Sequence, residues 1–275
     1  MKPTERRKYW RQVTQIQLKY QRKYKPLIER ELKDQVKRFI ENRNELWNDG
    51  LMNVLARLHR EVTVAFANLQ YKRLRVVTQK LTMGFNAKWT QEVNDWLSVY
   101  GLNLVSTITN SQRERIEAII NDVIQEGVVE GWGADFVTRE IEKRLIEFGR
   151  IGNNFIAERI ARTETLRAAN IGHMKGASEH NFYVKKIWIA AKDNRTRRNE
   201  REDEFDHWDL DGQAREMDEM FYQVGLTGKI ANAMQPGDSG ADRGERNPPE
   251  FTINCRCTIA FEAKRDSNGR IIMKK

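Results

Sequence analysis

The chain has 275 residues, which is enough for one large domain or for two smaller ones that each have a hydrophobic core. Hydrophobic residues make up 39% of it, charged residues 32% and aromatic residues 9%, a composition that predicts much solvated helix surface and argues against global disorder. No segment approaches the roughly 20 apolar residues of a membrane span, and the basic, polar start is not expected to be a secretory signal. With only two cysteines, Cys255 and Cys257, we expect no disulfide framework and a reducing compartment.

The net charge of +9 is unevenly placed along the chain. Residues 1–25 contain nine Lys or Arg and one acidic residue, whereas residues 201–220 contain nine acidic residues and two Arg. The last twelve residues are basic again. This asymmetry predicts a basic arm that meets an anionic partner and an acidic patch elsewhere in the protein.

Helical periodicity dominates the chain from Pro26 to about residue 179. No proline lies between 27 and 235, and Pro26 suits the first turn of a helix. Gly84 is expected to end one helix, and Ser111 with Glu114 matches a capping box that would begin another. The predicted helices cover 26–40, about 45–82, 85–104, 111–124, 136–148 and 153–179.

The pattern changes near Asn181. Val184–Ala191 is predicted to be a strand, and Phe251–Phe261 a second one. The predicted fold class is therefore α+β, with a long helical N-terminal part followed by a compact α+β C-terminal module that contains a small antiparallel sheet. The expected divisions are a basic arm (1–25), a helical domain (26–150), an α+β domain (151–265) and a basic tail (266–275).

Four segments of the C-terminal half carry a family resemblance. They are IAERIARTETLRAANIG (156–172), WIAAKDNRTRR (188–198), HWDLDG (207–212), and PGD (236–238) followed by INCRC (253–257). Their order resembles the phage Mu F-like family of minor head proteins, over about residues 155–262. The resemblance implies a low-copy protein inside the procapsid that is usually associated with the portal vertex and assists head assembly. Some members of the family enter the host with the DNA.

The charged residues of these segments are interpreted as structural. Glu158 and Arg162 lie one turn apart on a helix, and Glu164 is expected to meet Arg195 or Arg197, because guanidinium binds carboxylate with two hydrogen bonds. A transferase that uses Arg162 and Glu164 is the competing interpretation. The full structural signature is Arg162, Glu164, Asp193, Arg195, Arg197, His207, Asp211, Gly212, Pro236, Gly237, Asn254, Cys255, Arg256 and Cys257.

Two metal sites are weighed against this structural interpretation. His207, Cys255 and Cys257 are suitable zinc ligands, but a Cys-x-Cys pair in a strand would point its thiols to opposite faces. The prediction is therefore no cofactor, with zinc at these three residues as the alternative. A hard cation, as in a metal-dependent nuclease, has four candidate ligands whose positions turn chemistry explains equally well: Asp193, Asp206, Asp209 and Asp211.

The basic arm mixes cations with aromatic residues. Docking to an acidic portal surface is favoured, with contact to DNA as the alternative and a plain solvated helix as the third interpretation. Tyr9, Trp10, Tyr20 and Tyr24 are its aromatic residues. The partner- or DNA-binding residues are predicted to be Arg6, Arg7, Lys8, Trp10, Arg11, Lys19, Arg22, Lys23 and Lys25.

The predicted function is that of a minor head protein of a tailed bacteriophage, located in the capsid interior or at the portal vertex of the virion and assembled in the host cytoplasm. It would assist head assembly and genome packaging or delivery. Its partners would be the portal, scaffold or major capsid protein, and packaged double-stranded DNA, with no membrane. The chain has no P-loop, Rossmann glycine pattern, Gly-x-Ser-x-Gly or His-Glu-x-x-His, so an enzyme is not expected. A nucleic-acid-binding virion protein and a metal-dependent nuclease are the alternatives.

Overall fold

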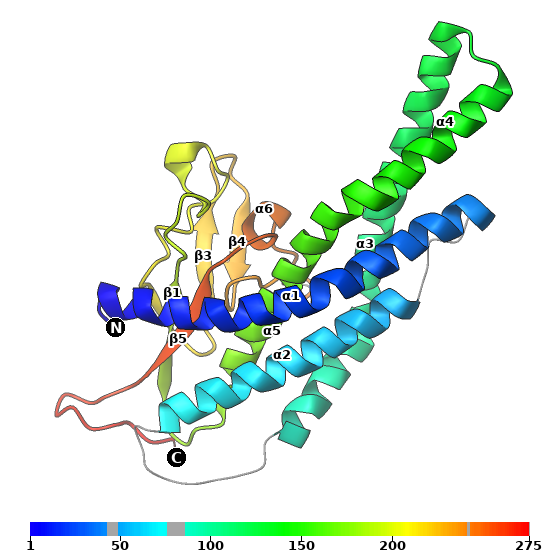
Figure 1. Cartoon of the computed structure of the whole chain (residues 1–275). Helices are drawn as coiled ribbons and strands as arrows, with labels where there is room; N and C mark the ends of the chain where they lie inside the picture. The colour runs from blue at the N-terminus through cyan, green and yellow to red at the C-terminus, as the bar shows by residue number, and fades with distance from the viewer. Residues whose placement is uncertain (43–48, 76–85, 241–242, 275) are drawn as a thin grey trace. The chain divides into compact units, whose positions relative to one another are not determined.

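The computed structural model describes residues 1–42, 49–75, 86–240 and 243–274 (Figure 1). The helices are α1 (Pro3–Asn42), α2 (Asp49–Arg75), α3 (Asn86–Glu130), α4 (Ala134–Glu147), α5 (Asn153–Ser178) and α6 (Pro249–Thr252), and a π-helical turn (Phe148–Gly152) joins α4 to α5. The strands are β1 (Val184–Ile189), β2 (Ala214–Glu216), β3 (Phe221–Val224), β4 (Ile230–Ala233) and β5 (Thr258–Ala263). Long helices followed by small antiparallel sheets confirm the predicted α+β class.

The chain forms two compact units. The first, called here the mixed unit, comprises Met1–Gln21, Leu58–Asp95 and Arg162–Lys275. The second, the helical unit, comprises Arg22–Arg57 and Trp96–Ala161. Helices α1, α2, α3 and α5 each contribute residues to both units. The divisions predicted at residues 25, 150 and 265 stay a prediction about which segments fold by themselves.

Helix α1 corrects the predicted role of Pro26. This proline lies inside the helix and not in its first turn. A proline in a helix removes one backbone hydrogen bond, but burial on both sides of it stabilises the continuous helix. Tyr9 and Val13 are buried before Pro26, and Ile28 and Leu32 after it, and the members of each pair are four positions apart. Tertiary packing therefore outweighs the local preference.

Helices α2 and α3 differ from their predicted bounds. Helix α2 is confirmed from Asp49 to Arg75, while the rest of the predicted 45–82 helix and its end at Gly84 lie outside the described residues. The predicted helix start at Ser111 is wrong, because α3 continues through this residue. The residues before Ser111 are already helical, so their carbonyls accept the N–H groups that a cap would otherwise satisfy.

The helical unit has an apolar core with two buried polar pairs. Val36, Ile116 and Leu145 form the centre of this core. Gln35 donates to the Thr109 hydroxyl at 3.2 Å, and Gln112 donates to the Asn153 side chain at 2.8 Å. The interruption between the predicted helices 111–124 and 136–148 is confirmed and lies at residues 131–133. Gly131 has a φ of 69°, and α4 returns beside the end of α3 (Figure 1).

The mixed unit contains a three-stranded antiparallel sheet in the order β2-β1-β5 and a separate β3-β4 hairpin. The predicted first strand is confirmed from Val184 to Ile189. The predicted second strand, Phe251–Phe261, is correct only from Thr258 onward. Pro248 and Pro249 begin the short α6 instead, since proline fits the first turn of a helix, and Asn254 then takes a left-handed φ of 60°.

The core of the mixed unit centres on Trp188, which packs against Phe221 and Phe251 at ring distances of 5.2 and 5.8 Å. Helix α5 lies very close to α2 in this unit. A Cβ atom on Gly172 would lie 2.4 Å from the Thr63 carbonyl oxygen, so this approach requires glycine. None of the helices, within the described residues, has a stretch apolar and long enough to cross a bilayer.

Candidate functional site

Residues at the start of the signature, on α5, hydrogen-bond the turn that leads into β5. Arg162 donates to the Asn254 side chain at 2.5 Å, and the Thr163 hydroxyl accepts the Asn254 backbone N–H at 3.0 Å. Asn254 is the residue with positive φ, a conformation that asparagine tolerates better than most residues. Two hydrogen bonds from one helix therefore fix the position of the Asn-Cys-Arg-Cys segment.

The predicted pairing of Glu164 with Arg195 or Arg197 is wrong. Glu164 is buried and accepts both 2.8 Å hydrogen bonds from Arg167, one turn along α5, and it lies 3.0 Å from His59 Nε2 on α2. Arg197 instead donates to the Ile253 carbonyl at 2.5 Å.

Burial alone would raise the pKa of Glu164, but Arg167 and His59 outweigh burial and hold this pKa below its usual value. Sequence reasoning missed His59 and Arg167. A signal for His59 was present, because it interrupts the apolar stripe of Leu55, Leu58 and Val62, and a polar residue on a buried stripe needs a polar partner.

The Pro236–Gly237 segment lies against the same helix. Arg167 donates to the Gly237 carbonyl at 3.1 Å, and Asn170 donates to the Pro236 carbonyl at 2.9 Å. The Asn170 side chain also accepts the Thr258 hydroxyl at 3.0 Å. Arg167 and Asn170 therefore connect α5 to two loops, and the second of these loops leads into β5.

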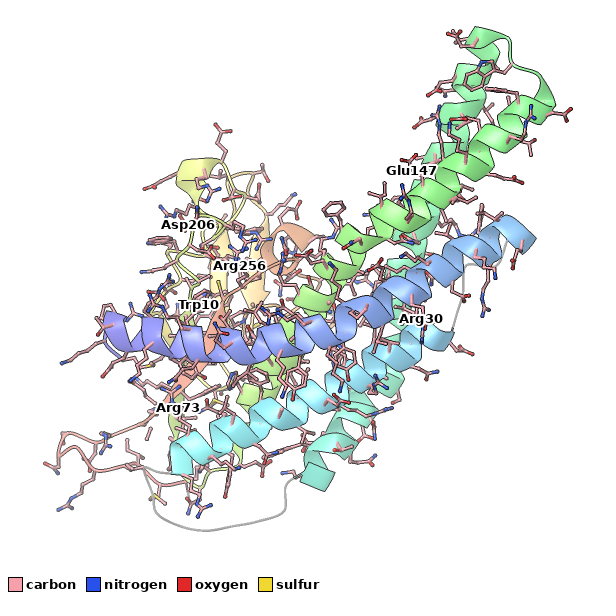
Figure 2. The ribbon with its side chains drawn as sticks, viewed as in Figure 1. Trp10, Arg30, Arg73, Glu147, Asp206 and Arg256 are labelled. Carbon is pink, nitrogen blue, oxygen red and sulfur yellow. The ribbon has the colours of Figure 1, made fainter. Side chains whose placement is uncertain are left out.

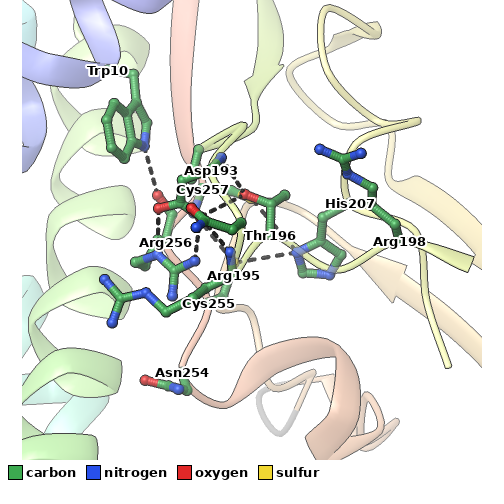
Figure 3. Close-up of polar contacts among 12 residues, drawn as sticks. Trp10, Asp193, Arg195, Thr196, Arg198, His207, Asn254, Cys255, Arg256 and Cys257 are labelled. Carbon is green, nitrogen blue, oxygen red and sulfur yellow. Dashed lines mark hydrogen bonds and ion pairs between the residues drawn. The ribbon is translucent and has the colours of Figure 1, made fainter. Parts of the chain in front are cut away.

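Asp193 is the turn residue that joins the loop after β1 to the Cys-x-Cys segment (Figure 3). Its carboxylate accepts two hydrogen bonds from Arg256, at 2.5 and 3.1 Å, and one each from the Arg195 N–H and the Thr196 hydroxyl. Partial burial would raise its pKa, but Arg256 and these donors lower it. The Arg195 side chain itself is exposed.

Asp211 and Gly212 form the third part of the signature. The Asp211 carboxylate accepts hydrogen bonds from Arg6 at 2.9 and 3.2 Å and from the Ala190 N–H at 3.1 Å, and it pairs with Lys192 at 2.8 Å. Gly212 has a φ of 86°, and a Cβ there would lie 2.9 Å from the Arg6 guanidinium carbon. Glycine therefore suits the positive φ of this turn, and a side chain here would have to displace the end of the Arg6 side chain.

The beginning of α1 docks onto these loops inside the mixed unit. Besides the Arg6–Asp211 pair, Arg7 donates to the Ala191 carbonyl, and Trp10 Nε1 donates to the Arg256 carbonyl at 2.9 Å (Figure 3). Arg6, Arg7 and Trp10, which were predicted to bind a partner, thus make contacts within the chain. Lys25 pairs with Glu158 at 3.6 Å in the helical unit. The remaining predicted partner-binding residues are exposed: Lys8, Arg11, Lys19, Arg22 and Lys23.

The other two acidic residues considered for a hard cation also make local contacts or lie apart. Asp206 accepts the N–H groups of Trp208 and Asp209 at 2.9 and 3.0 Å and that of Asn199 at 3.2 Å. Asp209 is exposed. Together with the pairs made by Asp193 and Asp211, these contacts leave the four carboxylates in separate places, and within the described residues they do not gather into a metal-binding group.

The cluster of His207, Cys255 and Cys257 corrects the predicted orientation of the thiols. The cysteines were expected to point to opposite faces of a strand, but they precede β5 and both are buried. His207 Nδ1 lies 3.4 Å from Cys255 Sγ and 3.6 Å from Cys257 Sγ. All three ligand atoms lie within 4.8 Å of one another. The cysteines lie in the irregular segment between α6 and β5, so the alternation of side chains in a strand does not apply to them.

The two thiols have different electrostatic surroundings. Burial disfavours both thiolates, but the hydrogen bond with Cys257 and the nearby His207 lower the pKa of Cys255. Burial and the neighbouring Cys255 sulfur raise the pKa of Cys257. Cys255 Sγ is therefore the sulfur that carries negative charge more readily.

The fold and the site define a helical protein with a small α+β module, whose signature side chains link α1, α5 and three loops of that module. The family model described as Phage Mu protein F like protein matches residues 118–260, just over half of the chain. The chain therefore belongs to the phage Mu F-like family, which is a family of phage head proteins. The match starts well before the predicted residue 155, within α3. No curated protein and no solved structure was found to match the chain.

Proposed function

We propose that this protein is a minor head protein that assembles into the phage capsid, at the portal vertex or in the capsid interior, and assists head assembly and genome packaging or delivery. Family membership supports capsid partners. The observation that carries the proposal is a contrast between two groups of side chains. Most signature residues make contacts within the chain, whereas several apolar side chains of the helical unit are uncovered. The latter suit an assembly protein, since exposed apolar groups are typical of surfaces that bind another protein.

The uncovered side chains lie on three elements of the helical unit. Val128 and Val129 at the end of α3 are 79% and 81% exposed, and Phe155 at the start of α5 is 73% exposed. Ile146 on α4, next to Glu147 (Figure 2), is 63% exposed. Burying such side chains against a capsid protein would contribute about 1.5–3 kcal/mol each when burial is complete.

A groove of about 490 Å³ adds charge to this apolar surface. Apolar side chains line it, and three basic residues and one acidic residue lie beside them: Val36, Ile40 and Ile146, then Lys33, Lys37, Arg150 and Glu41. An apolar groove with basic residues beside it suits a partner segment that has both apolar and acidic side chains. We propose this groove, together with Val128 and Val129, as the capsid-binding surface of the helical unit.

Co-assembly in the host tests the proposal. The full chain is expressed with the portal, scaffold and major capsid proteins of the same phage, and its copies per procapsid are counted after gradient purification. Val128→Glu with Val129→Glu should reduce incorporation roughly tenfold, because burying two carboxylates at the interface is unfavourable. Gln12→Glu with Gln15→Glu, which adds the same charge at exposed positions of α1, is the control. The proposal would be contradicted if the wild-type chain were not incorporated into procapsids. Equal incorporation of the wild-type chain and both variants would also contradict it.

Contact with packaged double-stranded DNA is the second candidate function. One observation favours it: Lys8, Arg11 and Lys19 are exposed and lie on one face of α1, at positions i, i+3 and i+11. Changing all three to Glu should remove about three phosphate contacts. The slope of log K for DNA binding against log salt concentration should then become shallower by about 0.9 per lost contact. The control with the same charge change is Lys185→Glu, Arg265→Glu and Arg270→Glu, also exposed in the mixed unit. An unchanged salt dependence in the α1 variant would exclude this contact.

A further inference from the structure

We infer that His207, Cys255 and Cys257 form a binding site for one zinc ion that cross-links the mixed unit. The site is independent of the capsid role proposed above. Within the described residues, these three side chains are the group of His, Cys and acidic residues whose ligand atoms converge closely enough to hold a metal. The ligand types, two thiols and one imidazole, are those that zinc prefers in proteins.

The two distances from the His207 nitrogen to the cysteine sulfurs are those of a tetrahedral zinc site. Zinc binds sulfur at about 2.3 Å and imidazole nitrogen at about 2.0 Å, so a tetrahedral ion places sulfur and nitrogen about 3.5 Å apart. The observed separations from His207 Nδ1 are 3.4 Å to Cys255 Sγ and 3.6 Å to Cys257 Sγ. Little movement is therefore needed to admit the ion.

A single hydrogen bond from His207 does not account for its short distances to both sulfurs. A ring nitrogen offers one proton or one lone pair, so His207 Nδ1 cannot make a full hydrogen bond with both thiols at once. His207 Nε2 is also buried and has no hydrogen-bond partner within the described part of the chain. A metal ion on Nδ1 would accept the lone pair and both sulfurs together, and it would leave the proton on Nε2.

The surroundings fix the three ligands in place before the ion arrives. The His207 ring packs edge-to-face against Phe251 at 4.7 Å and against Trp188 at 5.6 Å. The Cys257 backbone N–H donates to Cys255 Sγ at 3.4 Å, which stabilises negative charge on that sulfur. Arg162 fixes the turn before the cysteines through Asn254. A site held in this way binds a metal with little loss of conformational entropy.

Charge balance favours a divalent ion in this buried position. The three side chains are only 1–2% exposed, and two buried thiolates without a counter-ion would be unfavourable. One Zn²⁺ with two thiolates and a neutral imidazole has no net charge. Zinc at this position would connect His207, in the loop after β1, to the segment just before β5. Its fourth coordination position would be taken by a water molecule, since the described cluster supplies three ligand atoms.

Metal content and spectroscopy test the site. The full chain is purified under reducing conditions, loaded with zinc, passed through a desalting column and analysed by inductively coupled plasma mass spectrometry. We expect about one zinc per chain in the wild type, and loss of most of it in Cys255→Ser and Cys257→Ser. Arg256→Lys is the matched control, because Arg256 stands between the cysteines but binds Asp193. It should keep the metal.

Two measurements on the wild-type chain remain informative if the serine variants fail to fold. Cobalt(II) should give thiolate-to-metal charge-transfer absorption at one equivalent, and zinc in excess should abolish it. Zinc should also raise the melting temperature by roughly 5 °C, and a chelator should reverse this shift. No bound metal after loading, a Cys255–Cys257 disulfide under reducing conditions, or metal retained in both serine variants would each overturn the proposal.

Discussion

Selected ion pairs of the mixed unit are more deeply buried than those on the part of α1 that belongs to the helical unit. In the mixed unit, carboxylates bind cations from distant parts of the sequence: Arg6 and Asp211 are 205 residues apart, and Arg256 and Asp193 are 63 residues apart. On α1 of the helical unit, the pairs Lys33–Glu29 and Arg38–Asp34 join neighbouring turns of one helix and are half exposed. The former pairs fix tertiary structure, whereas the latter contribute little to it.

This comparison predicts that a carboxylate has a much larger effect on stability in the mixed unit. Glu164→Ala should lower the free energy of unfolding by about 3–5 kcal/mol, because it removes the buried carboxylate that Arg167 and His59 share. Asp34→Ala, on the exposed surface of α1, should change it by less than about 0.5 kcal/mol. Urea unfolding followed by circular dichroism measures both values. Equal losses of unfolding free energy in the two variants would contradict the predicted difference between the units.

A pH series sharpens the comparison, because all four histidines lie in the mixed unit. Burial lowers the pKa of His173 to about 3, so the folded state rejects a proton that the unfolded state binds below its usual pKa of 6.5. Stability should therefore fall as the pH decreases from about 6.5 toward 3, by up to roughly 1.4 kcal/mol per pH unit.

The measurement is urea unfolding at pH 7.5, 6.0 and 5.0, with His173→Gln as the matched variant. That variant should be less stable at pH 7.5, and its stability should depend less on pH. A steep dependence that persists unchanged in the variant would assign the effect to other groups. His180, whose pKa burial also lowers, is the next candidate.

Packing gives a third, smaller effect. Gly172→Ala would place a Cβ 2.4 Å from the Thr63 carbonyl oxygen on α2 and should lower the free energy of unfolding by about 1–3 kcal/mol. Gly133→Ala is the matched control in the helical unit, since its Cβ would meet nothing within 4 Å and its φ of −72° suits any residue. A stable Gly172→Ala protein would show that α2 and α5 can separate without loss of the fold.

The smallest expected effect is the coupling between Arg6 and Asp211. A double-mutant cycle with Arg6→Ala and Asp211→Asn should give about 1 kcal/mol, because the pair is largely buried but Lys192 also contacts the carboxylate. The same cycle with Lys33→Ala and Glu29→Gln should give about 0.3–0.5 kcal/mol. If the Arg6–Asp211 cycle gives no coupling free energy, the start of α1 is docked by the contacts of Tyr9 and Trp10 and not by this ion pair.

The sequence predicted the regular parts of the fold better than the contacts between them. Apolar periodicity is a local property, so it located α2, α3 and β1, although their ends depended on tertiary contacts. The predictions at Pro26 and Ser111 were wrong because both residue types favour the start of a helix. Packing of a long helix overrides this local preference. The extended-strand interpretation of Cys255 and Cys257 failed because the strand begins only at Thr258, after both cysteines.

The candidate site was predicted as a set of residues but not as a set of partners. Arg162, Asp193, Asp211 and Arg256 were recognised together through their resemblance to a family. Which carboxylate meets which arginine depends on the path of the loops in space, and sequence spacing carries little information about that path. The arm residues show the same limit, since Arg6 and Trp10 have the composition of a binding surface and yet contact loops of their own chain.

The docking of α1 has a consequence for biosynthesis. Trp10 hydrogen-bonds a carbonyl that lies 246 residues later, so it leaves the ribosome long before its partner is made. At a translation rate of about 5–20 residues per second, the nascent α1 waits roughly 12–50 seconds for this partner. During that interval, chaperones or a neighbouring nascent chain compete for this helix. Its docking is complete only after the segment that contains Arg256 has been synthesised.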